Sequence, residues 1–195
     1  GASVRPSSVV YDRADSAITQ ARAEEFDFDT IFEGVDLFHV SGITPVLSDT
    51  AAELTMTALK KAKEHGVTVS FDLNYRAKLW TEDVEEKQKM LSDMMPYVDI
   101  CFGNARDAAK CLGYTEGDTD FINGDYSICV DEEHMTNVMK HYGFTHLITT
   151  LRKSISASDN GWSGAICTSS GLYQGSNYNL HIVDRVGGGD SFASG

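Results

Sequence analysis

The feature that most limits the fold of this chain is a repeated alternation of short apolar runs with longer helical stretches. The runs at 36–43 and 67–72 are short and closed by small or polar residues, as buried parallel strands are. Between them, Ser48 is an N-cap candidate for a helix that reaches about His65 and is stopped by Gly66. Repeated strand–helix–strand units imply right-handed crossovers and a doubly wound, mostly parallel α/β sheet flanked by helices.

The other predicted elements follow from the same reasoning. The dipeptides Asn160-Gly161 and Ser170-Gly171 predict turns between two or three short strands over 154–179, and the first is a strong hairpin signal. Residues 115–130 are rich in glycine and aspartate and are expected to form a loop or small insertion. The predicted strands are 5–13, 36–43, 67–72, 98–102 and 146–150, and the predicted helices are 16–25, 49–65, 82–95, 105–112 and 132–142.

A glycine-rich turn stands beside a single carboxylate near the C-terminal end of the sequence. Gly187, Gly188 and Gly189 let the backbone approach an anion closely, and the next residues can begin a helix whose free N–H groups point back at the turn. Asp190 would then lie beside a bound phosphate and an incoming hydroxyl, whose proton a carboxylate can accept. The glycines alone are weak evidence, because a flexible loop capped by Asp190 has the same sequence.

The pattern Asp-x-x-Gly-x-Gly-Asp-x-Phe-x-x-Gly, from Asp184 to Gly195, resembles the C-terminal signature of the ribokinase-like (PfkB) sugar kinases. Arg185 replaces the usual threonine of that signature, and Gly188 the usual alanine. Arg185 puts a monovalent-cation site in doubt and is similar to the 2-keto-3-deoxygluconate kinase branch. The resemblance implies a ribokinase-like fold, ATP and Mg²⁺ as cofactors, and Asp190 as the base that activates a sugar hydroxyl.

A second stretch, from Asp72 to Trp80, follows a predicted strand, where ligands bind in such sheets. It resembles the Asp-x-Asn-x-Arg-x-x-Leu-Trp stretch of the same kinase branch, whose arginine meets the substrate and the transferred phosphate. The resemblance assigns Arg76 to a carboxylate or phosphate, which a planar guanidinium suits. The alternative is a surface arginine paired with Asp72 or Asp83.

A third stretch lies near the start of the sequence, where strand alternation places Val9, Tyr11 and Arg13 on one face. It resembles the lid strand of the same branch, so residues from about 1 to 15 are expected to form part of a substrate lid. Arg13 favours an acid sugar, because a neutral sugar has no carboxylate to pair with it. The alternative is a solvent-facing edge strand. Exposed lid strands often pair between subunits, so a homodimer is expected.

Two further positions are implied for ATP and the metal. Asn104 and Asp107 occupy the place of the family's Asn-x-x-Glu motif, which is associated with magnesium and phosphates. Asp107 reaches less far than glutamate and would act through a metal-bound water, and both residues are equally suited to cap the next helix. Arg152 falls where the family places nucleotide-phosphate contacts, with a solvated turn as the alternative. The ATP-binding residues implied are Asn104, Arg152, Gly187 and Gly189.

Bulk properties narrow the function classes. The formal net charge of −13 argues against nucleic acid or an anionic membrane as the main partner. No stretch approaches the roughly 20 apolar residues of a membrane span, and no basic-then-apolar signal-peptide pattern opens the given sequence, so a cytoplasmic enzyme is expected. The histidines form no His-x-x-x-His pair. The cysteines, expected to be reduced packing residues, are Cys101, Cys111, Cys129 and Cys167.

These observations predict a single, partial ribokinase-like domain over residues 1–195. The first quarter of a complete kinase and the segment after Gly195 are expected to be absent. The predicted reaction transfers the γ-phosphoryl group of ATP to the terminal hydroxyl of 2-keto-3-deoxygluconate, giving the 6-phosphate. The alternatives are a fructokinase or ribokinase, or a catalytically silent scaffold. A dinucleotide-binding oxidoreductase is disfavoured, because no acidic residue follows the glycines at the required distance.

Overall fold

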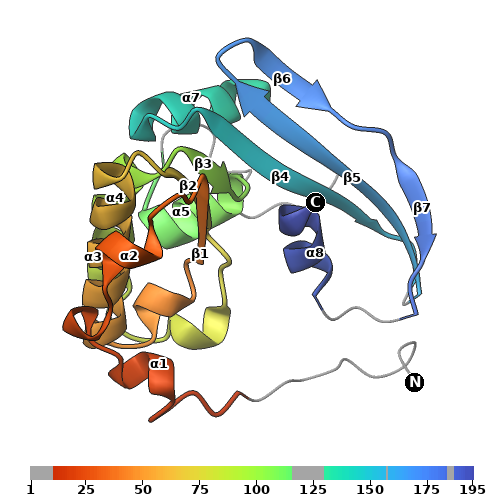
Figure 1. The fold of residues 1–195 in the computed structure, drawn as a ribbon. Helices are drawn as coiled ribbons and strands as arrows, with labels where there is room; N and C mark the ends of the chain where they lie inside the picture. The colour runs from red at the N-terminus through yellow and green to blue at the C-terminus, as the bar shows by residue number, and fades with distance from the viewer. Residues whose placement is uncertain (1–10, 116–129, 157, 184–186) are drawn as a thin grey trace.

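A seven-stranded mixed sheet forms the centre of the molecule (Figure 1). The computed structural model describes residues 11–115, 130–156, 158–183 and 187–195. The first four strands are parallel and lie in sequence order, β4 and β5 are antiparallel, and β6 and β7 both pair with the far edge of β5. The strands are β1 (Leu37–Ser41), β2 (Thr68–Asp72), β3 (Ile100–Phe102), β4 (His146–Ser154), β5 (Asp159–Thr168), β6 (Gly171–Gln174) and β7 (Tyr178–His181).

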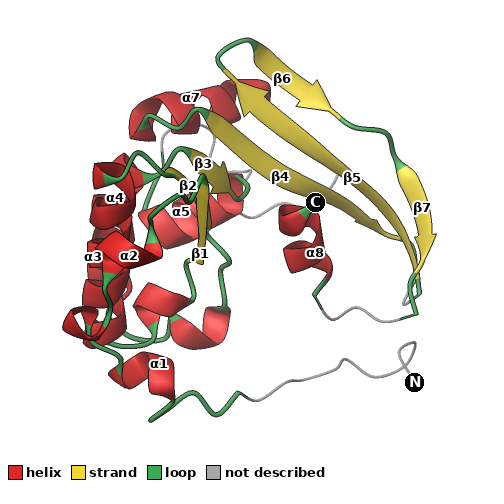
Figure 2. Ribbon diagram, viewed as in Figure 1, coloured by secondary structure: helices red, strands yellow, loops and turns green. Residues whose placement is uncertain are grey.

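Helices flank the sheet on both faces, which confirms the predicted α/β architecture (Figure 2). The helices between the parallel strands share one apolar core with β2 and β3, whereas α8 lies against the opposite face of β4 and β5. The helices are α1 (Ala17–Gln20), α2 (Phe28–Ile31), α3 (Asp49–Glu64), α4 (Val84–Met94), α5 (Ala105–Leu112), α7 (Glu132–Tyr142) and α8 (Gly188–Ser194), with 3-10 turns η1 (Ala23–Glu25), η2 (Thr44–Val46), η3 (Ala77–Leu79) and η4 (Met95–Tyr97).

Helix α3 confirms the prediction made from its end signals. The Ser48 hydroxyl accepts the Ala51 N–H at 3.1 Å, which caps the first turn. Buried positions recur every three or four residues along the helix and pack against the sheet. Gly66 follows the helix with φ +72°, a conformation that glycine adopts without strain.

The helix predicted over 16–25 is broken, and this prediction is wrong. Helix α1 ends at Gln20, and the next turn begins at Ala23 after two extended residues. The Thr19 carbonyl, which a continuing helix would use for its own hydrogen bond, accepts two hydroxyls from the start of α3. These come from Ser48 at 2.9 Å and Thr50 at 2.7 Å. Tertiary hydrogen bonds therefore end the helix.

The hairpin turn predicted at Asn160-Gly161 is also wrong, because both residues lie inside β5. Asn160 pairs with Ser154 of β4 on one side and with Leu180 of β7 on the other. Strand pairing on both sides overrides the local turn preference, and β4 runs on to Ser154 instead of ending at 150. The turn predicted at Ser170-Gly171 is confirmed, with β6 beginning at Gly171.

The predicted strand at 5–13 lies mostly outside the described residues, as does the 116–129 part of the predicted loop at 115–130. Where residues 11–13 are described, they form no strand. The chain turns immediately afterwards, since Asp15 has φ +57° and the Ser16 N–H donates to the Arg13 carbonyl at 3.3 Å. A strand up to residue 13 is therefore corrected to an irregular segment over 11–13.

The cysteines of the described chain are free and buried. Cys101 lies on β3 and Cys111 on α5, and burial raises the pKa of both thiols. Cys167 on β5 faces α7, with its sulfur 3.7 Å from the Thr136 hydroxyl. Cys129 lies outside the described residues. The three described cysteines are packing residues, as the sequence predicts.

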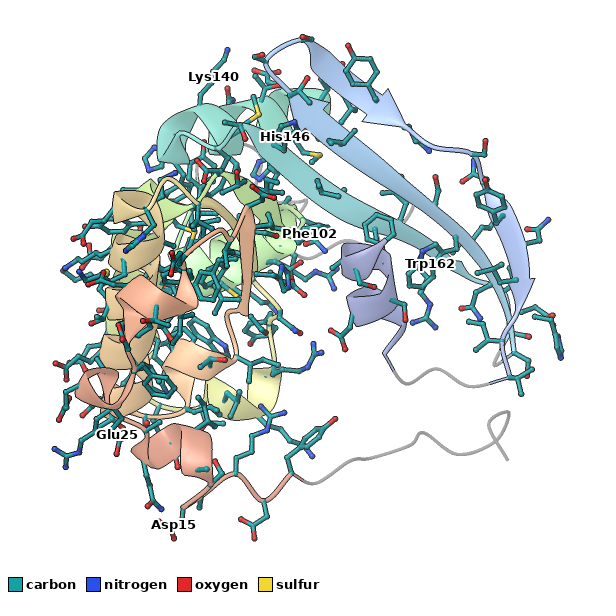
Figure 3. The ribbon with its side chains drawn as sticks, in the orientation of Figure 1. Asp15, Glu25, Phe102, Lys140, His146 and Trp162 are labelled. Carbon is teal, nitrogen blue, oxygen red and sulfur yellow. The ribbon has the colours of Figure 1, made fainter. Side chains whose placement is uncertain are left out.

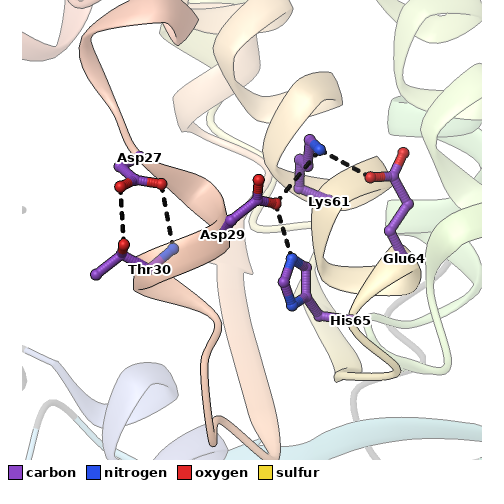
Figure 4. A network of polar contacts seen from close by, with 6 residues as sticks. All are labelled: Asp27, Asp29, Thr30, Lys61, Glu64 and His65. Carbon is purple, nitrogen blue, oxygen red and sulfur yellow. Dashed lines mark hydrogen bonds and ion pairs between the residues drawn. The ribbon is translucent and has the colours of Figure 1, made fainter.

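A polar network joins α2 to the C-terminal end of α3 (Figure 4). Asp29 Oδ1 lies 2.9 Å from His65 Nε2 and 3.4 Å from Lys61 Nζ, and Lys61 also pairs with Glu64 at 2.9 Å. The hydrogen bond to His65 and the charge of Lys61 lower the pKa of Asp29.

None of the described helices combines the length and apolar character needed to cross a bilayer.

Candidate active site

The carboxyl ends of the parallel strands meet at one edge of the sheet. Ser41, Asp72 and Phe102 are neighbours in the strand register of β1, β2 and β3. The hydrogen bonding continues one residue past the strands, from the Gly42 N–H to the Asp72 carbonyl at 2.7 Å and from the Leu73 N–H to the Phe102 carbonyl at 2.9 Å. The residues that follow these strands therefore start from a fixed base, as the sequence predicts.

Asn74 turns the chain directly after β2. Its backbone has φ +44°, a left-handed conformation that is uncommon for residues other than glycine. Its amide Nδ2 donates to the Ser41 hydroxyl at 3.1 Å, and its N–H donates to Asp72 Oδ1 at 3.0 Å. These contacts with two neighbouring strands hold the turn that leads to Arg76.

Arg76 projects from this turn into solvent. In the described part of the chain it forms no ion pair with Asp72 or Asp83, the alternative considered from the sequence. Its one side-chain hydrogen bond there runs from Nη1 to the Tyr75 carbonyl at 3.2 Å. Burial raises the pKa of Asp107, and the positive charge of Arg76 opposes that rise. Arg76 therefore remains available to bind an anion.

Asn104 and Asp107 cap the start of α5. Asn104 Oδ1 accepts the Asp107 N–H at 3.0 Å, and Asp107 Oδ2 accepts the Asn104 N–H at 3.0 Å. The capping alternative considered from the sequence is thus present. Oδ1 of Asp107 is not used in this pair.

Asp72 is a buried carboxylate that feels the charges of two other carboxylates at this edge. Burial is the main cause that raises the pKa of Asp72, and the charges of Asp107 and Asp190 raise it further. Burial also raises the pKa of Asp107. Across the described residues, no group of three histidine, cysteine or acidic side chains is arranged to hold a metal ion directly. A cation held through water and a phosphate would relieve the crowding of negative charge, so the residues fit a Mg²⁺–phosphate complex.

Helix α8 brings Asp190 to this edge from the other side of the molecule. Gly187 precedes the helix with φ +75°, and its carbonyl accepts the Ser191 N–H at 2.8 Å. Asp190 stands exposed in the first turn. The Phe192 ring fixes the helix, lying edge-on to Phe102 with ring centres 6.4 Å apart (Figure 3 labels Phe102).

Residue alternation shows what faces α8 from the sheet. The Phe192 ring lies against Gly164, where a Cβ atom would come within 2.7 Å of it. Two residues earlier on the same face, Trp162 reaches Gly188, 3.9 Å from where a Cβ would stand (Figure 3 labels Trp162). Arg152 lies directly opposite Trp162 in the antiparallel register. Its side chain therefore shares the face that carries the glycine turn.

The two predicted lid residues contact each other. The Arg13 guanidinium lies 4.4 Å from the centre of the Tyr11 ring, and Tyr11 is 62% exposed. Within the described residues, neither side chain forms a hydrogen bond or ion pair with the residues at the strand ends. The structure thus brings Tyr11 and Arg13 into contact with each other, but it joins neither of them to Asp72 or Asp190 through a hydrogen bond or ion pair among the described residues.

Comparison with known proteins identifies the family. The family described as pfkB family carbohydrate kinase matches residues 4–195. The chain belongs to this family. The pfkB chain is 33% identical over 193 residues to the 2-dehydro-3-deoxygalactonokinase of Haloferax volcanii, covering 98% of this chain and 53% of that protein. It is 27% identical over 187 residues to the 2-dehydro-3-deoxygluconokinase of Bacillus subtilis, covering 96% and 50%.

Solved structures agree with these relatives. A crystal structure of 2-dehydro-3-deoxygluconokinase from Thermotoga maritima matches the pfkB chain with a TM-score of 0.84 and 46% identity, covering 99% of this chain and 56% of that one. A putative ribokinase II from E. coli, in complex with ATP and Mg²⁺, shares the fold with a TM-score of 0.69 at 17% identity, covering 94% and 51%. The chain thus spans about half the length of the relatives it matches.

An open cavity lies beside α8, on the face of the pfkB sheet that carries Trp162 and Gly164. Its volume is about 540 Å³, and Trp162, Tyr173 and Phe192 form part of an apolar wall. The sequence predictions assigned no ligand role to Asp72, Asn160 or Trp162. Alternation along β5 would have indicated the last two, but only with the strand taken to begin at Asp159 and not after the predicted turn.

Proposed function

We propose that the protein is an ATP-dependent kinase that phosphorylates the terminal hydroxyl of 2-keto-3-deoxygluconate, giving the 6-phosphate. Family membership supports sugar phosphorylation, and relatives named for 2-dehydro-3-deoxy sugar acids support an acid sugar. The single observation that carries the proposal is the packing of α8, which carries Asp190, at the strand ends, where Phe192 lies edge-on to Phe102 at the end of β3 with ring centres 6.4 Å apart. It brings a base from the glycine turn to the edge where such sheets bind ligands.

Asp190 is the proposed general base. It accepts the proton of the terminal hydroxyl as that oxygen forms a bond to the γ-phosphorus. The bond between the γ-phosphorus and the β–γ bridging oxygen breaks, and its electron pair leaves with ADP. The backbone N–H groups of Gly187, Gly188 and Gly189 stabilise the phosphoryl oxygens, because a glycine backbone lets an anion come close.

The roles proposed for the other charged and polar residues follow from where each side chain lies. Arg76, which is free to bind an anion, neutralises the moving phosphoryl group or the substrate carboxylate. Arg152 on the face of the glycine turn binds the phosphates of ATP. Asn104 and Asp107 would hold Mg²⁺ through water, using acceptor positions that the cap does not occupy. Bound Mg²⁺ supplies charge neutralisation for the ATP phosphates.

Tyr11 and Arg13 are proposed to close over the substrate as a lid. The cation–π pair presents one guanidinium and one aromatic face together, which suits a carboxylate attached to a carbon chain. The exposure of Tyr11 also supports pairing of two lids in a homodimer. Light scattering after size-exclusion chromatography tests that assembly, and a single-subunit mass would refute the dimer.

The proposed reaction is tested by ADP release from the complete product of the gene with Mg-ATP. The acceptors are 2-keto-3-deoxygluconate, its C4 epimer 2-keto-3-deoxygalactonate, fructose and ribose, and Asp190→Asn is the blank. The expected result is the highest kcat/KM with 2-keto-3-deoxygluconate. A preference for fructose or ribose would keep the kinase but reject the acid sugar. ADP release with none of the four would favour a catalytically silent scaffold.

A further inference from the structure

Asn160 carries a polar side chain at a fully buried position of β5. Its exposed fraction is 0%, and its Oδ1 accepts a hydrogen bond from Arg152 Nε at 2.9 Å. An arginine Nε can only donate, so this contact fixes which end of the amide faces Arg152. The orientation of the Asn160 side chain is therefore determined by the arginine.

The other end of the same amide is left unpaired. Nδ2 of Asn160 is buried and has no hydrogen-bond partner among the described residues. A buried donor without a partner is unfavourable, and an apolar side chain of similar size at this position would avoid that cost. The side-chain interaction that offsets it in the described structure is the hydrogen bond to Arg152.

Residue alternation shows which face of the sheet carries the hydrogen bond between Asn160 and Arg152. Asn160, Trp162 and Gly164 alternate along β5 and share one face, on which Trp162 reaches Gly188 and Gly164 meets Phe192. Arg152 stands opposite Trp162 on that face. The Asn160 amide thus holds the arginine on the side of the sheet where the glycine turn lies.

We infer that Asn160 is a positioning residue for nucleotide binding, which orients the Arg152 guanidinium toward the phosphate groups of ATP. The inference rests on the nucleotide role of Arg152 under the proposed function. An arginine side chain loses much rotamer freedom when it binds a ligand, and one already held by a buried acceptor loses less. Asn160 acts through Arg152, so the effect of removing its amide depends on the arginine.

The test is calorimetric titration of the complete gene product with Mg-ATP, without any sugar. The variants are Arg152→Ala, Asn160→Leu and the two combined, since leucine keeps the number and branching of the heavy atoms of asparagine without its polar atoms. Each single change is expected to weaken ATP binding about tenfold, as loss of a contact to a charged group does. The double variant is expected to bind ATP as Arg152→Ala does.

Two outcomes with Asn160→Leu would overturn the inference. One is wild-type affinity in Asn160→Leu. The other is a further tenfold loss when Asn160→Leu is added to Arg152→Ala, because a purely structural role would add in both backgrounds.

A second variant keeps the inference testable if Asn160→Leu does not fold. Arg152→Lys retains the positive charge but has no Nε–H of the guanidinium type to meet Oδ1, so about a tenfold weaker affinity is expected. Unchanged affinity in Arg152→Lys would refute the positioning role. Lys153→Ala is the matched control, because Lys153 is exposed and adjacent on β4 but points to the other face. An equal loss in that control would show a general charge effect and overturn the inference.

Failure of the two proposals can be told apart. Wild-type affinity in Arg152→Ala removes the nucleotide role of that arginine and the inference with it. Normal ATP binding and the expected variant pattern, with no ADP release on any sugar, would reject the proposed reaction and leave the role of Asn160 supported.

Discussion

Asn104 and Asp107 each accept the backbone N–H of the other at 3.0 Å, so the two residues proposed to meet magnesium also begin α5. The reciprocal cap leaves Oδ1 of Asp107 unused in the pair, and burial raises the pKa of this carboxyl. A nearby cation would favour its charged form. One pair of side chains can therefore serve helix stability and metal binding through different atoms.

Substitutions separate these two roles. Asn104→Ala is expected to lower the free energy of unfolding by about 1 kcal/mol, because the helix loses its N-cap. Asp107→Asn keeps an oxygen for the Asn104 N–H, so its free energy of unfolding is expected to change by less than half as much. The same variant is expected to need more Mg²⁺ for half-maximal ATP binding. Urea unfolding and Mg²⁺-dependent calorimetry measure the two effects, and unchanged Mg²⁺ dependence would leave Asp107 with the cap alone.

Asp190→Asn is expected to abolish turnover with little change in ATP affinity. The amide keeps the shape of the carboxylate but cannot accept the hydroxyl proton. Single-turnover ADP formation and ATP titration measure the two properties in the same preparation. Turnover within tenfold of the wild type would sink the role of Asp190 as base, whereas loss of ATP binding would point to a structural effect on α8.

Arg13→Ala is expected to raise the KM for 2-keto-3-deoxygluconate at least tenfold. The KM for a neutral sugar that the enzyme also phosphorylates is expected to change far less. Only the acid sugar carries a carboxylate for the guanidinium to meet. Tyr11→Phe is a suitable control, since it keeps the ring that stacks on Arg13. Equal increases of KM for both sugars would contradict the carboxylate contact.

Asn74→Ala is expected to destabilise the protein by about 1–2 kcal/mol, because alanine is strained at the positive φ of this turn. Asn74→Gly is the matched variant, with no such strain but without the hydrogen bond to Ser41. Urea unfolding compares the two, and glycine is expected to be the more stable. Equal stability would show that the left-handed backbone at this position is not a source of strain.

Asp29 is expected to make stability depend on acid pH. Its folded-state pKa is lowered below the ordinary value of 3.8, so its contribution is present above that pH and is lost as pH falls through the folded pKa. Asp29→Asn should therefore lower the Tm at neutral pH, and the difference should shrink below pH 3.8. Asp93→Asn, which removes an exposed pair within α4, is the control. A Tm difference that is the same at pH 7 and pH 3 would contradict this origin.

The sequence predicts well those elements whose ends are set by local chemistry. Ser48 and Gly66 delimit α3 because a cap and a positive φ are properties of single residues. The helix over 16–25 and the turn at Asn160-Gly161 were wrong because distant strands and hydroxyls compete for the same backbone groups. Local propensity cannot register those competitors.

The candidate site shows the same division. The sequence assigned roles to Asn104, Arg76 and Asp190 because each follows a strand or a glycine turn in a motif that the chain retains, and these roles stay predictions. It assigned none to Asn160 and Trp162, because their face is defined only by pairing of β4 with β5. The position of α8, which carries Asp190, depends on the packing of Phe192 on Phe102, between residues far apart in sequence.

The buried thiols of Cys101 and Cys111 are internal reporters of local unfolding. Burial keeps both in the neutral form, and an alkylating reagent attacks the thiolate. Their labelling must therefore wait for β3 and α5 to open, next to the edge that holds Asp72 and Asp107. The rate of thiol labelling is therefore set by how often this part of the fold opens locally. A ligand that stabilises the strand ends is expected to lower that rate.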